Sequence, residues 1–147
     1  MRSLDDPTAT PADAALAAVA EAARALAGGP GGDDPREIIC RSALAVAGAD
    51  LAVLRMSDGV RIARRHGHGP LPSGLHTLPE GPGVPQSLLD ATDCHSLHIE
   101  PLDEGLLAVA WREQVDRLPH EVVAALRVLA DLASVAGERA RLRARAA

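Results

Sequence analysis

The stretch that decides the fold covers residues 97–142 and reads LHIEPLDEGLLAVAWREQVDRLPHEVVAALRVLADLASVAGERARL. Its first part alternates apolar and polar residues on either side of a short turn at residues 103–105, which predicts two strands joined as a hairpin. Pro119 then suits the first turn of a helix, because its φ is fixed and that position needs no N–H donor. We therefore expect a long helix after the hairpin.

This expected helix is apolar on two sides. Two stripes recur at helical spacing: Val122, Leu126, Leu129, Ala133 and Ala136 in one, and Val123, Leu132 and Val135 in the other. A helix with two apolar faces needs two packing partners. We expect the sheet to cover one face, and another helix or another subunit to cover the second.

The same residues resemble a GAF domain, the small sensory α+β module of signalling proteins. The family pattern is a strand ending in Pro-Leu, a hairpin into Gly-x-Leu-x-Val and a helix with Leu-Ala-x-x-Ala spacing, found here at residues 101–102, 105–109 and 129–133. Residues 48–50, Gly-Ala-Asp, look like the family's entry into its first strand. The resemblance spans about residues 34–142. Every matched position is structural, so it implies a fold and no chemistry.

Two more helices are expected upstream of this stretch. Residues 1–9 are expected to be a disordered polar leader, after which Thr10 caps a helix over residues 11–27. Asp34 caps a second helix that begins at Pro35 and ends before a glycine.

A second hairpin should complete the sheet. Residues 51–56 form an apolar run and residues 60–66 alternate, with a Ser-Asp-Gly turn between them. Residues 67–93, called the lid below, are rich in Gly and Pro and read as loop with one short helix at 86–90. The predicted fold is α+β: a GAF-like antiparallel sheet with the N- and C-terminal helices packed on one face and the short lid on the other. One domain covers residues 10–142, and 143–147 are the helix end or tail.

Composition narrows the classes of partner. The chain has 147 residues and a net charge of −5, its fifteen basic residues are all Arg, and Phe and Tyr are absent. An acidic domain without aromatic stacking platforms is a poor nucleic-acid binder. Two cysteines make no disulfide framework, and no apolar run is long enough to span a bilayer. We therefore expect a cytoplasmic protein that binds neither nucleic acid nor membrane.

The candidate ligand-contacting side chains lie around the lid. They are His66, Cys94, His95, His98 and Glu100. In GAF domains the ligand lies between the sheet and the segment after the second strand, so the resemblance implies a pocket between the sheet and the lid. We expect this pocket to be small or collapsed and rimmed by His66, His98 and Glu100, because a segment of about thirty residues made mostly of loop formers covers little ligand surface. Cys and His can ligate zinc or haem iron. However, His95 and His98 fall on opposite faces of a strand and no second ligand pair follows, so we expect no metal and no cofactor.

Three functions fit these patterns. The favoured one is a non-catalytic regulatory or sensory module that delivers its signal to a separate, unidentified signalling protein, with or without a small-molecule ligand. The second is a thiol-dependent reductase similar to the free methionine sulfoxide reductases, with Cys94 as the remaining candidate nucleophile. The third is a haem- or metal-bound redox sensor.

A homodimer is also expected. The terminal helices still carry apolar stripes after one face of each is buried, and such stripes commonly mark an interface. The candidate contact residues are Leu16, Val19, Leu129, Leu132 and Val135.

Overall fold

The computed structural model describes residues 11–28, 34–65 and 92–146. The leader, Thr10, His66 and most of the lid with its expected short helix lie outside these residues. The described elements are α1 (Pro11–Ala27), α2 (Pro35–Ala47), β1 (Leu51–Met56), β2 (Gly59–Arg64), β3 (Ser96–Leu102), β4 (Gly105–Trp111) and α4 (His120–Ala146). These are the helices and hairpins that the periodicity predicts.

The four strands form one antiparallel sheet in the order β2-β1-β4-β3. Each hairpin pairs internally, and the two hairpins meet through β1 and β4, where Leu54 lies opposite Leu107. Gly105 stands where β4 begins beside the end of β1. A Cβ at that position would lie 1.8 Å from the carbonyl oxygen of Arg55, so only glycine permits this approach.

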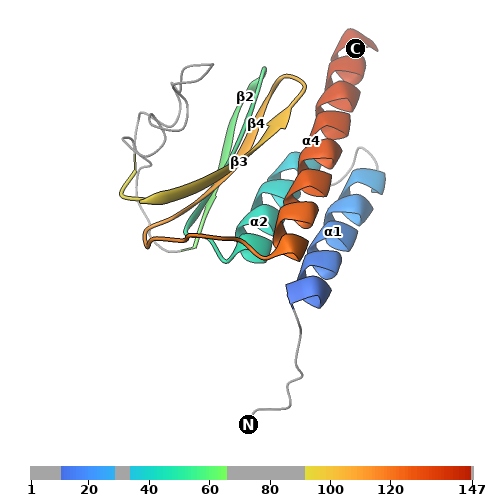
Figure 1. Cartoon of the computed structure of the whole chain (residues 1–147). Coiled ribbons are helices and arrows are strands. Elements are labelled where there is room, and N and C mark those ends of the chain that lie inside the picture. Colours follow the sequence, from blue (N-terminus) through green and yellow to red (C-terminus); the bar gives the residue numbers. More distant parts are fainter. Residues whose placement is uncertain (1–10, 29–33, 66–91, 147) are drawn as a thin grey trace.

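The three described helices lie on one side of the sheet (Figure 1). α2 and α4 pack directly on the strands, and α1 packs on α2 and α4 as an outer helix. The core between them holds the largest fully buried side chains of that side: Ile39, Cys40, Leu54, Leu107, Val109, Leu126 and Leu129. α1 contributes Ala22, whose small side chain lets the helices approach closely. The predicted fold class is therefore confirmed for the sheet and its helices.

The opposite face of the sheet is also apolar and buried. It carries Leu51, Val53, Cys94, Leu106, Ala108 and Ala110, flanked by Val60, Ile62, Leu97 and Ile99. Residues of β1 and β4 are thus buried on both faces, which explains why their sequences read as apolar runs rather than as strict alternation. The expected covering segment lies largely outside the described residues.

A charged cluster fixes the start of α2 to the β1–β2 hairpin. The Asp34 carboxylate caps the helix by accepting a 3.0 Å hydrogen bond from the backbone N–H of Arg36. The Arg36 guanidinium donates to Asp58 at 2.8 Å, and that of Arg61 on β2 donates to Asp34 at 3.0 Å. Gly48, at φ 59°, ends the helix in the left-handed conformation that favours glycine.

Among the described residues, none of the helices is long and apolar enough to cross a membrane.

Candidate functional site

The five candidate ligand-contacting residues do not gather at one place. His66 lies outside the described residues. His98 and Glu100 lie on β3, whereas Cys94 and His95 precede that strand.

His98 and Glu100 face the helices, not the lid. In the antiparallel register His98 lies opposite Val109 and Glu100 opposite Leu107, and both partners belong to the helix-side core. The Nε2 atom of His98 lies 2.6 Å from Oε2 of Glu100, and Oε1 of Glu100 lies 3.6 Å from Nε of Arg127 on α4. The expectation that these two residues rim a pocket on the lid side is therefore corrected. Their alternation showed that they share a face but not which face it is.

Cys94 and His95 point to different environments. Cys94 is buried with the apolar residues of the lid-side face, and this burial raises the pKa of its thiol. His95 is exposed, and its Nδ1 atom lies 2.6 Å from the backbone carbonyl oxygen of Arg112. Within residues 11–28, 34–65 and 92–146, no group of three or more His, Cys, Asp or Glu side chains could hold a metal ion.

Cys40 is packed as a small apolar residue of α2. Its Sγ atom lies 3.5 Å from the carbonyl oxygen of Ala52 inside the helix-side core. Burial raises the pKa of this thiol from 9.0 to about 12. The thiolate is the nucleophile in cysteine chemistry, and a reactive thiol needs an electropositive, exposed setting. Cys40 and Cys94 are both buried, so neither has this setting.

We expect both thiols to react slowly with the thiol reagent DTNB in the folded protein. A pKa of about 12 in place of 9.0 leaves Cys40 with about a thousandth of the ordinary thiolate population at pH 8. Absorbance at the DTNB product band measures the rate, and the protein unfolded in guanidinium chloride serves as the control with both thiols accessible. A rapid phase in the folded protein that disappears in Cys94→Ser would instead identify Cys94 as a reactive thiol.

The dimer candidates divide into exposed and buried residues. Leu16 on α1 is 70% exposed and Val135 on α4 is 42% exposed, whereas Val19 and Leu132 are half-buried against the core. Leu129 is completely buried, so its assignment to an intersubunit surface is wrong: it belongs to the helix-side core.

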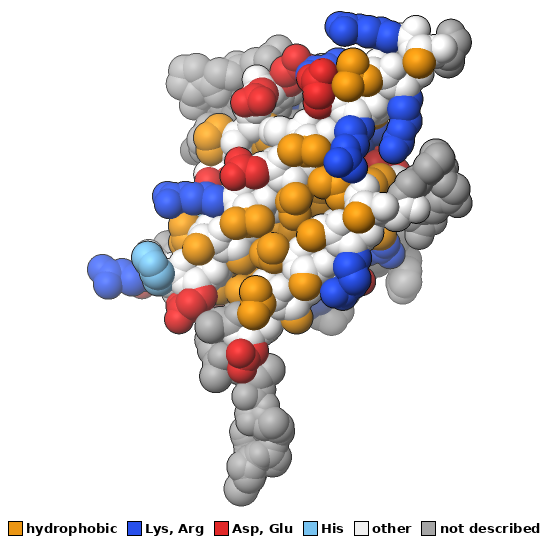
Figure 2. All heavy atoms as spheres, turned by 90° about the vertical axis from the view of Figure 1, so that its right-hand side faces the viewer, with side chains coloured by type: hydrophobic (Ala, Val, Ile, Leu, Met, Phe, Trp, Pro, Cys, Tyr) orange, Lys and Arg blue, Asp and Glu red, His pale blue; other side chains and the backbone are white. Residues whose placement is uncertain are grey.

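Two further exposed large hydrophobic residues lie on α4 and were not among the candidates. They are Val128 and Leu142, which are seven residues on either side of Val135. Figure 2 shows hydrophobic side chains gathered in a band over this side of the molecule. We call Leu16, Val128, Val135 and Leu142 the outer helix face. The spacing of seven between Val128, Val135 and Leu142 was the signal in the sequence that could have identified the exposed residues of α4.

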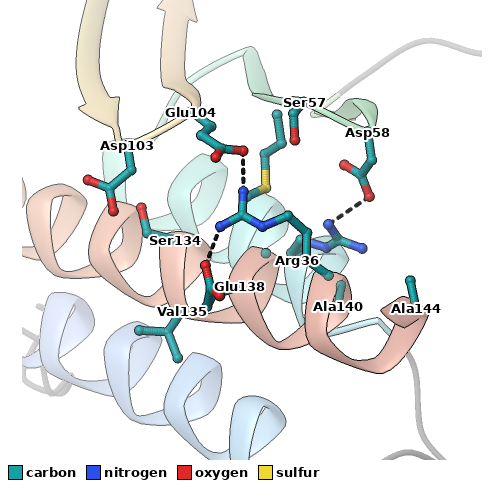
Figure 3. A pocket seen from close by; sticks show the side chains of 13 residues that line it. Arg36, Ser57, Asp58, Asp103, Glu104, Ser134, Val135, Glu138, Ala140 and Ala144 are labelled. Carbon is teal, nitrogen blue, oxygen red and sulfur yellow. Dashed lines mark hydrogen bonds and ion pairs between the residues drawn. The ribbon is translucent and has the colours of Figure 1, made fainter. Parts of the chain in front are cut away.

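A groove of about 400 Å³ lies at the end of the sheet where both hairpins turn. It is bounded by Ser57 and Asp58 of the first turn, Asp103 and Glu104 of the second, and the part of α4 from Ser134 to Ala144 (Figure 3). We call it the turn groove. It was not predicted, because its walls come from segments far apart in the sequence.

The lining of the turn groove carries two guanidiniums, Arg36 and Arg141, and four carboxylates, Asp58, Asp103, Glu104 and Glu138, so its formal charge is −2. The Arg141 guanidinium donates to both Glu104 and Glu138, and the Arg36 guanidinium donates to Asp58 (Figure 3). A second, shallower groove between α2 and β2 is lined by Asp34, Glu37, Arg41, Leu44, Ile62, Ala63 and Arg64. Neither groove contains Cys94, His95, His98 or Glu100.

Comparison with known proteins identifies the fold. No protein-family model matches the chain, and no curated protein is similar enough to count as a relative. One solved structure that is similar is the GAF domain of a protein assigned as a sensor histidine kinase from Pseudomonas syringae pv. tomato. It superposes with a TM-score of 0.62 and 24% sequence identity over 90% of each chain. The architecture is thus that of a GAF domain, as residues 97–142 predict.

Proposed function

We propose that this chain is a regulatory module of the GAF type, which catalyses no reaction itself, pairs with a second copy through α1 and α4, and passes a signal to a separate protein. The observation that carries the proposal is the outer helix face, where exposed apolar side chains lie on the outer side of the helices (Figure 2). The likeness to a GAF domain assigned to a sensor histidine kinase supports the signalling part.

The spacing and the charge of the outer helix face favour a second copy as the occupant. Val128, Val135 and Leu142 recur every seven residues, which is the repeat of helices that pair along a seam. α1 and α4 both carry acid in the first turn, at Asp13 and Glu121, and Arg in the last turn. A two-fold axis perpendicular to the helices brings opposite charges together, so the face is complementary to itself.

The absence of catalysis is proposed from the state of the candidate side chains. A thiol reductase needs an accessible thiolate, whereas burial raises the pKa of both Cys40 and Cys94. His98 and Glu100 lie across the sheet from Cys94 and cannot act with it. Binding of a small molecule on the lid side of the sheet stays a prediction.

Val128→Arg is expected to weaken self-association about thirty-fold, because each copy loses the burial of one apolar side chain and gains a charge in the seam. Val128 is 41% exposed within one protomer, so the fold should tolerate the substitution. Light scattering coupled to size-exclusion chromatography measures the mass across a dilution series.

Gln114→Arg is the matched control, since it adds the same charge at an exposed loop position after β4. Leu16→Arg tests how much α1 contributes to self-association. The pairing proposal is rejected if the unmodified protein is a monomer at tens of micromolar, or if Gln114→Arg dissociates it as well as Val128→Arg does.

A further inference from the structure

The C-terminal part of α4, after Gly137, is less buried than the rest of the helix. Gly137 is the last buried residue of this helix, and within its described length every residue from Glu138 to Ala146 is at least partly exposed. A Cβ at Gly137 would lie 2.4 Å from the Cε atom of Met56, so the missing side chain makes room for Met56 of β1. Close apolar packing of α4 on the sheet therefore ends at this contact.

Beyond Gly137, two arginines of α4 make polar contacts with other elements. The Arg139 guanidinium donates to the backbone carbonyl oxygen of Leu26 at the end of α1, at 2.9 Å. The Arg141 guanidinium reaches across the turn groove to Glu104 in the β3–β4 turn, and Glu138, one turn earlier on α4, binds the same guanidinium. Figure 3 shows Glu104 and Glu138 on opposite sides of this guanidinium.

The ion pair between Arg141 and Glu104 can break without disturbing the core. The turn groove, of about 400 Å³, lies between the hairpin turns and α4, so the ion pair crosses an open space and not a packed interface. Arg141 and Glu104 are both more than one third exposed, and an ion pair of that exposure is weak and sensitive to salt. When the ion pair with Glu104 breaks, the Arg141 guanidinium keeps its ion pair with Glu138 on the same helix.

We propose that the ion pair between Arg141 and Glu104 is a latch through which the β3–β4 turn controls the order of the C-terminal part of α4. This inference rests on the proposed regulatory function, because it assigns the signal to a change in the helix end. β4 is an inner strand of the sheet, paired with both β1 and β3, so a displacement of the sheet would move the turn that bears Glu104.

The test is hydrogen exchange of the backbone amides, followed by mass spectrometry on the whole chain. Glu104→Gln is expected to raise exchange in residues 138–146 about two- to five-fold, the range that loss of one exposed ion pair produces. Exchange in β1 and β4 should stay unchanged. Raising the NaCl concentration from about 0.05 to about 0.5 M should have the same local effect in the unmodified protein and little further effect in Glu104→Gln.

Asp103→Asn is the matched control, because it removes the neighbouring charge of the same turn and should leave residues 138–146 unchanged. The latch is refuted if Glu104→Gln leaves exchange there unaltered, or if Asp103→Asn raises it equally. Repeating the comparison in Val128→Arg separates the latch from self-association. If the unmodified protein is a monomer and Glu104→Gln still has its local effect, the latch is kept and the pairing is rejected. If the unmodified protein is a dimer and Glu104→Gln has no local effect, the pairing is kept and the latch is rejected.

Discussion

Leu129→Ala is expected to lower the free energy of unfolding by about 3 to 4 kcal/mol. Leu129 has no exposed surface and lies in the core between the sheet, α2 and α4, so truncation removes buried apolar area and leaves a cavity. Urea unfolding followed by circular dichroism, at one fixed protein concentration, measures the change. The concentration must be fixed because self-association adds to the apparent stability.

Val128→Ala is the matched control, since Val128 is the preceding residue of the same helix and lies on its exposed side. Its 41% exposure limits the change within the protomer to about 1 kcal/mol or less. A small effect of Leu129→Ala together with loss of the dimer would return Leu129 to the intersubunit surface. A large effect in both variants would mean that the outer helix face is required for folding.

Local sequence patterns predicted the elements of this fold well. The Asp-Pro start before α2, the apolar run of β1 and the alternation around the β3–β4 turn each report on neighbouring residues alone. Gly105 was matched as part of a family pattern, and its close approach to Arg55 gives that match a physical cause. Such signals are sufficient because the geometry they describe is completed within a few residues.

The sites were predicted less well, because they depend on which face of an element meets which neighbour. A period of two places His98 and Glu100 on one face of β3, but the pairing of β3 with β4 decides that this face meets the helices. A period of 3.6 gives α4 two apolar stripes, and only the position of the sheet buries Leu129 and leaves Val128 outside. The turn groove needs both hairpins and α4 together, and no single stretch encodes it.

The charged cluster at the start of α2 allows a prediction that involves both stability and pH. Burial by itself would raise the pKa of Asp34, but hydrogen bonds and charge from Arg36, with a further hydrogen bond from Arg61, lower it from 3.8 to about 2. A carboxyl whose folded pKa is depressed stabilises the fold at pH values above its unfolded pKa. That stabilisation is then lost as the pH falls from about 4 towards 2.

Asp34→Ala is expected to lower the free energy of unfolding at pH 7 by about 2 to 3 kcal/mol. About 1 kcal/mol comes from the lost helix cap. The remainder comes from Arg36, whose side chain is only 9% exposed and keeps Asp58 as its remaining carboxylate partner. This remainder is smaller than the roughly 3 to 5 kcal/mol of a fully buried pair, because Asp34 itself is 33% exposed.

Asp34→Asn separates the two contributions, because asparagine caps helices as well as aspartate but carries no charge. It should therefore lose less stability at pH 7 than Asp34→Ala, and its free energy of unfolding should fall less than that of the unmodified protein between pH 4 and pH 2. Urea unfolding at a series of pH values measures both quantities. Parallel pH dependence of Asp34→Asn and the unmodified protein would show that Asp34 titrates alike in the folded and unfolded chains. In that case the ion pairs with Arg36 and Arg61 add nothing to stability, and the helix cap alone fixes α2 to the hairpin.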